Sequence, residues 1–379
     1  MASTRKSDNT AATFHLHTFL LVFYLLIRPG SMVVVLNGVL ADECPTSVRA
    51  LLAAHPGYRD AAAQLLGAAV RVLGPAHLLY VAQRELAAVA PHDKNVQIIG
   101  SDDATSCIIV VVRHSGSGAV ALAHLDGSGT ADAAAAMVAR VQQLAVGYPE
   151  GRLELQLVGG FTDPHRYSDE LFANIMLSFH RLTVEIDLTL ACCCELNTAL
   201  GGGSPAPLVT GVGVDIRAGD LFPATFPDKG PELPLRGART ITGGPHSAQV
   251  WQTENRCRLD GPNDRGSCRW QGSNIGVDSY GCREVLDIYD NGVGMLRVGP
   301  FNYDPLRGVD LWLEQSDDFI LQHLSTTPAV EPPHFVHNIR MTLKFIQQHP
   351  FPAVTVFPDN RPHYYRRDEQ SGCWVPMRF

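Results

Sequence analysis

The chain has 379 residues, of which 45% are hydrophobic and 18% are charged. A globular protein of this size and composition needs no disulfide or metal to hold its core. The net charge of -8 and the pI of about 6.0 exclude the clustered basic face of a nucleic-acid-binding protein. Nine cysteines are present, but none of them forms a CxxC pair, so neither a thioredoxin motif nor a zinc ribbon is indicated.

The first 31 residues contain a short apolar run from Phe19 to Ile27. This run is too short to span a membrane and resembles the core of a signal peptide, but no clear small-x-small cleavage site follows it. We expect residues 1–31 to be a disordered or signal-like extension that the fold does not need, with Met32 as an alternative start. The uneven cysteine usage favours a reducing compartment. The predicted location is therefore the cytoplasm or the nucleus, and secretory targeting is the alternative.

The part of the chain that follows Met32 begins with alternating short helices and strands. The apolar stretch from Val33 to Leu36 predicts a buried strand. The helical spacing of leucine and alanine predicts helices over 46–55 and 58–73. Short strands are expected at 78–83 and 96–99.

The clearest strand of the chain covers residues 107–113, where β-branched residues run continuously as CIIVVVR. Because this segment is apolar on both faces, it should lie centrally in a sheet that is covered on both sides. The sequence HSGS at 114–117 predicts a turn, and residues 118–125 predict the next strand.

The remaining elements continue this α+β pattern within a single domain over residues 32–379. A flexible link is expected at 201–205, where the sequence is GGGSP. Residues 246–284 are polar and contain Cys257, Cys268 and Cys282 at spacings that match no zinc site, so they predict a flexible inserted loop. Further helices are expected over 131–144, 168–180, 317–324 and 335–348, and further strands over 153–158, 182–194 and 209–216.

The predicted hairpin places a cysteine and a histidine on the same face of a sheet. With a four-residue loop at 114–117, Cys107 lies directly opposite His124. If the loop tightens to two residues, His124 lies opposite Ile109 and still shares the face of Cys107. Directly opposed Cβ atoms are about 4.5–5.5 Å apart. An imidazole at that distance can take the thiol proton, and the resulting thiolate–imidazolium pair would have a lowered thiol pKa.

The polar loop before Cys107 adds further candidate groups. Its free backbone N–H groups could hold the oxyanion of a tetrahedral intermediate. Ser101 is placed to orient His124 or a substrate group, and Asp102 and Asp103 add negative charge. The competing interpretation is that Cys107 is a core residue, since cysteine is among the most buried residue types.

Several stretches together resemble one protein family, the protein N-terminal asparagine amidohydrolases, and the resemblance covers residues 32 to about 375. The central stretch is GSDDATSC at 100–107, followed by Arg113-His114 and by HLDG at 124–127. The other stretches are LLYV at 78–81, QREL at 83–86, LVGGF at 157–161, ELN at 195–197, GGP at 243–245, LST at 324–326 and EPPHF at 331–335.

This resemblance implies a fold, a reaction and a set of site residues. The fold would be a layered sheet sandwich flanked by helices, like the core of the bacterial chemoreceptor and toxin glutamine deamidases, with Cys107, His124 and Ser101 as catalytic residues. The reaction would convert an N-terminal Asn of a protein into Asp and ammonia through a thioester, without a metal or organic cofactor. The family feeds the arginylation branch of the N-degron pathway, so the expected partners are proteins with a free N-terminal Asn, with the arginylation machinery downstream.

The residues that recognise the substrate are less determined by the sequence. A free α-ammonium group needs a carboxylate, for which Asp102, Asp103 and Glu195 are the candidates. Asn must be distinguished from Gln by the depth of the pocket, because one methylene is worth only about 1–3 kcal/mol. The alternatives are a deamidase that acts on internal Gln or Asn residues, and a non-catalytic binding module on the same fold.

Overall fold

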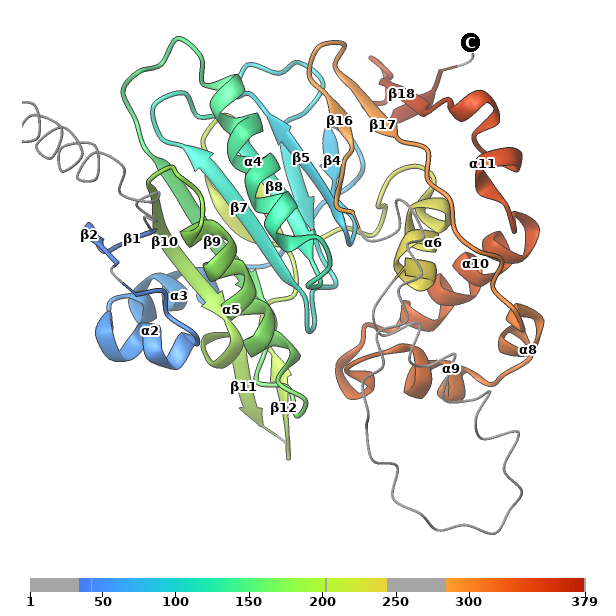
Figure 1. Cartoon of the computed structure of the whole chain (residues 1–379), viewed down its shortest axis with the longest axis horizontal. Helices are drawn as coiled ribbons and strands as arrows, with labels where there is room; N and C mark the ends of the chain where they lie inside the picture. Colours follow the sequence, from blue (N-terminus) through green and yellow to red (C-terminus); the bar gives the residue numbers. More distant parts are fainter. Residues whose placement is uncertain (1–33, 42, 202, 244–283, 378–379) are drawn as a thin grey trace, which may run out of the picture.

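The computed structural model describes residues 34–41, 43–201, 203–243 and 284–377 (Figure 1). Its largest element is an eight-stranded sheet with the order β15-β5-β8-β7-β9-β10-β1-β2. These strands are β1 (Val34–Leu36), β2 (Val39–Leu40), β5 (Glu85–Val89), β7 (Ile108–His114), β8 (Val120–Leu125), β9 (Leu153–Gly159), β10 (Ile186–Cys193) and β15 (Leu286–Asp287).

The strand predicted to be central, β7, lies in the middle of this sheet. It pairs in antiparallel fashion with β8 on one side and with β9 on the other. Five of its seven residues form one unbroken buried run, Ile108 to Val112. Both faces of the sheet are therefore covered, as the continuous apolar sequence of this strand predicts.

A second, smaller sheet packs against one face of the large sheet. Its order is β3-β14-β13-β6-β4, formed by β3 (Arg71–Val72), β4 (Leu78–Tyr80), β6 (Ile98–Ser101), β13 (Val212–Asp215) and β14 (Leu221–Thr225). Ile109 and Val111 of β7 share a buried cluster with Ile99 and Val212 of this sheet. The alternation of side chains along β7 thus places every second residue between the two sheets.

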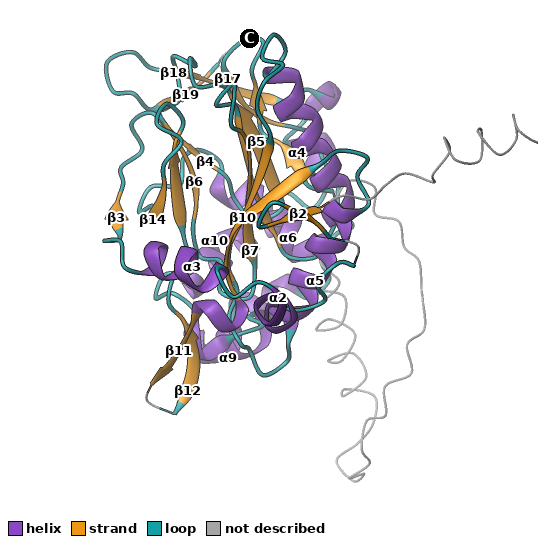
Figure 2. Ribbon diagram, turned by 90° about the vertical axis from the view of Figure 1, so that its left-hand side faces the viewer, coloured by secondary structure: helices purple, strands orange, loops and turns teal. Residues whose placement is uncertain are grey.

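The opposite face of the large sheet is covered by helices α4 (Thr130–Leu144) and α5 (Tyr167–His180), and α2 (Val48–Ala54) joins the same buried cluster. Val110 of β7 meets Met137 of α4 and Phe172 of α5 in that cluster. Figure 2 shows the resulting order of layers, in which helices, large sheet and small sheet follow one another. The structure is therefore a mixed α+β protein with layered sheets, in agreement with the predicted fold class.

A group of C-terminal helices lies together beside these layers (Figure 1). Trp312, Ile320 and Leu343 form a buried core for the helices of this group. A four-stranded sheet, β16-β17-β18-β19, lies next to them. The elements are α6 (Leu233–Gly243), α8 (Val309–Leu313), α9 (Asp317–Leu324), α10 (Phe335–Gln348), α11 (Pro352–Thr355), β16 (Tyr289–Asp290), β17 (Met295–Val298), β18 (His363–Arg367) and β19 (Trp374–Pro376).

Two of the predicted elements differ from the structure. The helix expected over 58–73 is α3 (Tyr58–Leu66), which ends at the C-cap Gly67 and leaves Arg71 free to pair in β3. Three residues of the link expected at 201–205 are instead paired in a hairpin, Gly201 in β11 (Thr198–Gly201) and Ser204 and Pro205 in β12 (Ser204–Pro207). A run of glycines suits a tight hairpin turn as well as a linker, so composition alone cannot separate the two.

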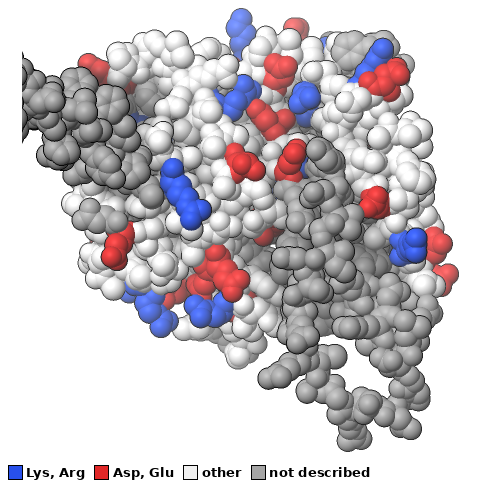
Figure 3. All heavy atoms as spheres, in the orientation of Figure 1, with Lys and Arg blue, Asp and Glu red and all other residues white. Residues whose placement is uncertain are grey.

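The predicted N-terminal extension and nearly all of the predicted insertion, residues 246–283, lie outside the described residues. Within the described part of the chain, no helix is both long and apolar enough to cross a membrane. On the face seen in Figure 3, basic and acidic side chains are interspersed among uncharged ones.

Candidate active site

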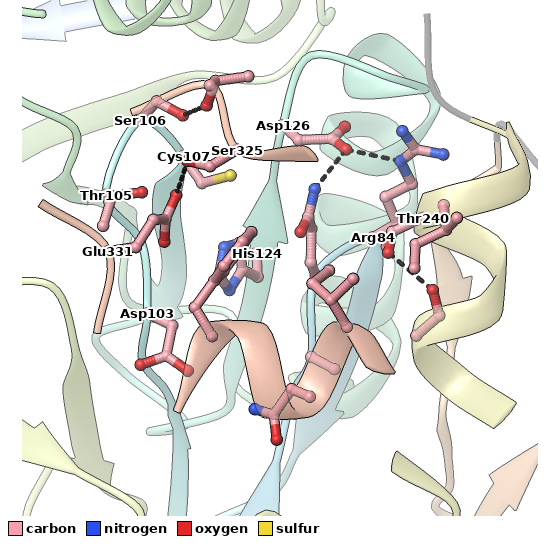
Figure 4. A pocket seen from close by; sticks show the side chains of 18 of the residues that line it. Arg84, Asp103, Thr105, Ser106, Cys107, His124, Asp126, Thr240, Ser325 and Glu331 are labelled. Atoms are coloured by element: carbon pink, nitrogen blue, oxygen red, sulfur yellow. Dashed lines mark hydrogen bonds and ion pairs between the residues drawn. The ribbon is translucent and has the colours of Figure 1, made fainter. Parts of the chain in front are cut away.

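A cavity of about 530 Å³ opens between the sandwich and the C-terminal helices. From the sandwich come Cys107, His124 and Asp126, and from the segment between α9 and α10 come Ser325 and Glu331. Figure 4 shows that these side chains surround one space. The cavity therefore unites parts of the chain that are more than 200 residues apart.

The hairpin of β7 and β8 brings Cys107 and His124 to this cavity in the alternative of the two expected registers. His124 pairs with Ile109, so the prediction that it lies directly opposite Cys107 is wrong. The loop is displaced because the backbone N–H of His114 donates to the carbonyl of Ala119 at 2.9 Å. The loop moves by one residue, from 114–117 to 115–118, and this shifts the pairing register by two residues. The alternation of side chains therefore still leaves Cys107, which directly precedes β7, on the face of His124.

Ser101 is the third predicted member of the site, and it is fully buried at the end of β6. Its Oγ lies 2.8 Å from Nδ1 of His124. The other ring nitrogen of His124, Nε2, is buried and has no hydrogen-bond partner among the described residues. If Nδ1 carries the proton and donates it to Ser101 Oγ, then Nε2 presents its lone pair to the cavity, as a general base requires.

Burial governs the pKa values of both groups. Burial raises the pKa of the Cys107 thiol well above its ordinary value, and the negative charges of Asp126 and Glu331 raise it further. Burial also lowers the pKa of His124 to about 4. The expected lowering of the thiol pKa is therefore not found in the free protein, where a neutral thiol and a neutral imidazole are favoured.

The loop that leads to Cys107 is held close to the end of β9. Gly159 has a φ of 111° there, and a Cβ on it would lie 2.8 Å from the carbonyl oxygen of Cys107. The loop is fixed on its other side by the backbone N–H of Ala104, which donates to Thr210 at 2.9 Å. Among the described residues, no acceptor is found for the backbone N–H of Ser106 or Cys107, so both remain available to an oxyanion.

Two of the predicted ammonium-binding carboxylates, Asp102 and Asp103, already hold an ammonium group from the chain itself. Nζ of the buried Lys229 donates to both carboxylates. Asp102 also accepts from the hydroxyl of Tyr80 and from the backbone N–H of Phe226, each at 2.8 Å. The two oxygens of Asp102 are thus engaged within the protein, although both aspartates line the cavity.

The third candidate, Glu195, does not line the cavity. It lies in a short 3-10 helix after β10, and its carboxylate accepts from the exposed Arg49 at 3.4 Å. The neighbouring residues Cys192, Cys193 and Cys194 are buried in the sandwich. No group of three or more potential metal ligands is found in the ranges that the structure describes.

Glu331 is a cavity carboxylate that the sequence interpretation did not single out. Its Oε1 accepts from the hydroxyls of Ser325 and Thr327, and no ion pair joins it to a described basic residue. Burial raises the pKa of its carboxyl to about 6. The signal in the sequence that could have identified Glu331 is its place in the EPPHF stretch at 331–335, one of the stretches that carry the family resemblance.

A second missed residue, His334, lies at the cavity edge just before α10. Its Nε2 is 2.8 Å from Oδ2 of Asp103. This hydrogen bond raises the pKa of His334. Together with the Ser106–Thr326 hydroxyl contact of 2.8 Å, it fastens the loop before Cys107 to the C-terminal helices.

The layered fold brings a cysteine, a histidine and a serine together at one polar cavity, an arrangement of the kind that hydrolases with a thiol nucleophile use. The sequence model of one family, described as protein N-terminal asparagine amidohydrolase, matches residues 68–264 and 268–376. The chain belongs to this family and is an amidohydrolase that acts on a linear amide.

Curated relatives agree with this assignment. Proteins named protein N-terminal asparagine amidohydrolase from Sus scrofa and Homo sapiens are each 38% identical to the chain over 330 residues. These alignments cover 87% of this chain and 93% and 94% of the two relatives. A relative with the same name from Arabidopsis thaliana is 24% identical over 316 residues, which cover 78% of this chain and 80% of the relative.

Proposed function

We propose that the protein hydrolyses the side-chain amide of an N-terminal Asn in proteins, and so produces an N-terminal Asp and ammonia. The names of the relatives describe this activity in those proteins. The observation that carries the proposal is the placement of Cys107 and His124 on one face of the β7–β8 hairpin at the cavity, with Nδ1 of His124 bonded to Ser101. This arrangement supports a thiol nucleophile and an oriented general base.

The first half of the proposed reaction forms a thioester. As Sγ of Cys107 attacks the carboxamide carbon, its proton passes to Nε2 of His124, because the free thiol is neutral and the imidazole can accept a proton. The backbone N–H groups of Ser106 and Cys107 hold the developing oxyanion. His124 then gives its proton to the amide nitrogen, the carbon–nitrogen bond breaks, and ammonia leaves.

The second half restores the enzyme. His124 takes a proton from a water molecule, whose oxygen attacks the thioester carbon. The carbon–sulfur bond breaks, the proton held by His124 returns to Sγ of Cys107, and the new side-chain carboxylic acid of Asp loses its remaining proton to solvent. Ser101 keeps the imidazole in the same orientation through both steps, so one base serves the attack of the thiol and the attack of the water.

The α-ammonium group of the substrate is assigned to Glu331 rather than to the carboxylates first considered. Asp102 and Asp103 already accept hydrogen bonds from the ammonium group of Lys229, and Glu195 does not line the cavity. Glu331 lines the same cavity as Cys107, with Oε1 bonded to two hydroxyl groups. A cationic ligand would provide the charge-assisted hydrogen bond that this buried carboxylate lacks within the described chain.

The wider setting of the reaction remains part of the proposal. We expect the fold to be related to that of the chemoreceptor and toxin glutamine deamidases, in which a Cys, a His and a Ser or Thr act together. The product would enter the arginylation branch of the N-degron pathway. The predicted location is accordingly the cytoplasm or the nucleus, and the substrates are proteins or peptides with a free N-terminal Asn.

A peptide deamidation assay tests the proposal. Three short peptides begin with Asn, with Gln and with acetylated Asn, and the mass gain of Asn to Asp is followed for the wild type and for Cys107→Ala. We expect conversion of the free-Asn peptide alone, and its loss in Cys107→Ala.

Other outcomes of the assay would contradict the proposal in different ways. Turnover of acetylated or internal amides would instead indicate a general side-chain deamidase. A folded wild-type protein that converts none of the peptides would indicate a binding module.

A further inference from the structure

Two sequence motifs that the catalytic mechanism leaves unexplained meet beside the cavity. From the first motif, QREL at 83–86, Gln83 Nε2 and Arg84 Nε donate to Oδ2 of Asp126 at 2.7 and 2.6 Å. Asp126 belongs to the second motif, HLDG at 124–127, and its Oδ1 accepts from the backbone N–H of Ser128 at 3.0 Å. Figure 4 shows Asp126 beside Cys107, with Arg84 bonded to Asp126 on the side away from Cys107.

The contact between the two motifs also involves the backbone of His124. The backbone N–H of Arg84 donates to the carbonyl of His124 at 2.9 Å. Gln83 and His124 form an isolated parallel bridge. Gln83 and Arg84 therefore hold the end of β8 at two points. Their main chain contacts His124, and their side chains contact Asp126, which directly follows the strand.

The conformation of Arg84 indicates that this segment is held under strain. Its φ of 60° lies in the left-handed region, which a residue with a long side chain seldom adopts. Such a conformation persists only where surrounding contacts determine it. Here Arg84 Nη1 donates to the carbonyl of Arg239 in α6 and Arg239 Nη1 donates to the carbonyl of Arg84, each at 3.3 Å.

The ion pair is buried enough to influence both reacting groups. The side chains of Arg84 and Asp126 are 3% and 10% exposed. The charge of Asp126 raises the pKa of Cys107 and of His124, whereas Arg84 lowers that of Cys107.

Other charged groups also face the two reacting side chains. Glu331 acts on Cys107, while Asp103, Lys229 and Glu85 act on His124. A pH profile of the variants must therefore be read against this whole set of charges.

We propose that Arg84 and Asp126 form a positioning pair, which fixes the end of β8 and so keeps the imidazole of His124 in its orientation at the cavity that Cys107 also lines. Neither residue needs to touch the reacting atoms for this role. The inference rests on the proposed function, because it assigns His124 as the base. It adds that the QREL and HLDG motifs act together to orient that base.

The test combines two readouts on Asp126→Asn, which keeps the shape of the side chain and removes its charge. The first is kcat and KM on a peptide with a free N-terminal Asn. We expect kcat to fall about 10- to 100-fold with KM within about threefold, because a small displacement of the base affects the chemical step and not binding. The acidic limb of the pH profile of kcat should also move to lower pH, since Asp126 raises the pKa of His124.

The second readout is the rate at which iodoacetamide alkylates Cys107, followed by mass spectrometry of the Cys107 peptide. Removal of the negative charge lowers the thiol pKa, so this rate should rise about twofold or more while turnover falls. These opposite changes separate loss of positioning from loss of the nucleophile. Because alkylation needs no substrate, the comparison remains valid even if the wild type fails to deamidate Asn peptides. That failure would contradict the proposed function and not the positioning role.

Matched variants complete the experiment. Glu154→Gln breaks the Arg113–Glu154 pair at the opposite end of β7, whose side chains are 22% and 17% exposed, and should leave kcat within about twofold. Arg84→Lys should give an intermediate loss of kcat, because it keeps the charge and loses the planar donor.

The outcomes that overturn the inference are also defined. If Asp126→Asn does not fold, Gln83→Met removes one donor to Asp126 and should still lower kcat about three- to tenfold. A folded Asp126→Asn protein with kcat within threefold of the wild type overturns the positioning role. So does an equal fall in turnover and alkylation.

Discussion

The thiol and the imidazole of the candidate site are each kept neutral by burial, and the carboxyl group of Glu331, to which we assign the substrate ammonium, has a raised pKa. These three groups therefore titrate in well-separated ranges. A pH experiment can therefore distinguish the ionisation of Glu331, which affects substrate binding, from that of His124, which affects the chemical step. The separation also means that the proposed general base remains unprotonated throughout the neutral range.

The pH dependence of the reaction follows from these pKa directions. Glu331 must be ionised to hold the substrate ammonium, so kcat/KM should fall about tenfold per pH unit below its pKa of about 6. Above about pH 8 it should fall again, because the α-ammonium group of the substrate loses its proton. By contrast, kcat should persist until His124 is protonated at a pH of about 4.

The variant Glu331→Gln checks this assignment. It should raise KM about 10- to 100-fold, as expected for the loss of a charge-assisted hydrogen bond, and should remove the limb near pH 6. An unchanged limb in Glu331→Gln would assign that ionisation to another group.

Individual site residues could be predicted to different degrees. The shared face of Cys107 and His124 follows from side-chain alternation and survives the two-residue error in register. The role of Lys229 could not be predicted. It lies more than 120 residues from Asp102 and Asp103, and no local pattern in the sequence indicates that its ammonium group donates to their carboxylates. Glu331 was missed although its hydroxyl partners Ser325 and Thr327 are close to it in the chain, because its place at the cavity of Cys107 depends on the fold.

At the scale of elements, the end of β9 controls the position of the nucleophile. Gly159 can approach the Cys107 carbonyl only because it lacks a Cβ and tolerates a φ of 111°. Gly159→Ala should reduce kcat about 10- to 100-fold, because the loop before Cys107 must move. It should also lower the free energy of unfolding by about 1–3 kcal/mol.

A substitution at a second glycine separates the effect of backbone strain from the effect of a displaced loop before Cys107. Gly147 also has a positive φ of 94°, but a Cβ on it would meet no atom within 4 Å. Gly147→Ala should thus lose stability in a urea titration while keeping its kcat. If the two variants lose activity equally, contact with Cys107 is not the cause.

A helix or strand is predicted accurately when the residues that determine it lie within the element itself. The amphipathic periods of α9 and α10 gave helix bounds that agree with the structure at both ends, 317–324 and 335–348. The helix over 58–73 was predicted too long because β3 has only two residues and is defined by its pairing with β14. The order of strands in both sheets depends on such long-range pairing, which no local pattern contains.

At the scale of the whole molecule, a buried ion pair attaches the C-terminal helices to the sandwich. Arg236 of α6 donates to both oxygens of Glu85 in β5 at 2.9 and 2.6 Å, and the side chains are 1% and 3% exposed. Glu85→Gln leaves the arginine charge without its partner. We expect the free energy of unfolding to fall by about 3–5 kcal/mol, measured by urea denaturation.

The control for this prediction is a pair on the surface. Arg361 and Asp359 are 3.8 Å apart with side chains 75% and 79% exposed. Arg361→Gln should change the free energy of unfolding by less than about 1 kcal/mol. A loss as small as this in Glu85→Gln would mean that the buried pair does not hold the two parts together.

Cys107 and His124 lie more than 200 residues before Glu331 in the chain, and this separation has a consequence for the synthesis of the protein. Residues 107 and 124 leave the ribosome well before residue 331, since translation adds about 5–20 residues per second. On the proposed assignment, a growing chain carries the thiol and the imidazole before it carries the carboxylate of Glu331. We therefore expect a chain that ends before residue 331 to lack the proposed site for the substrate ammonium.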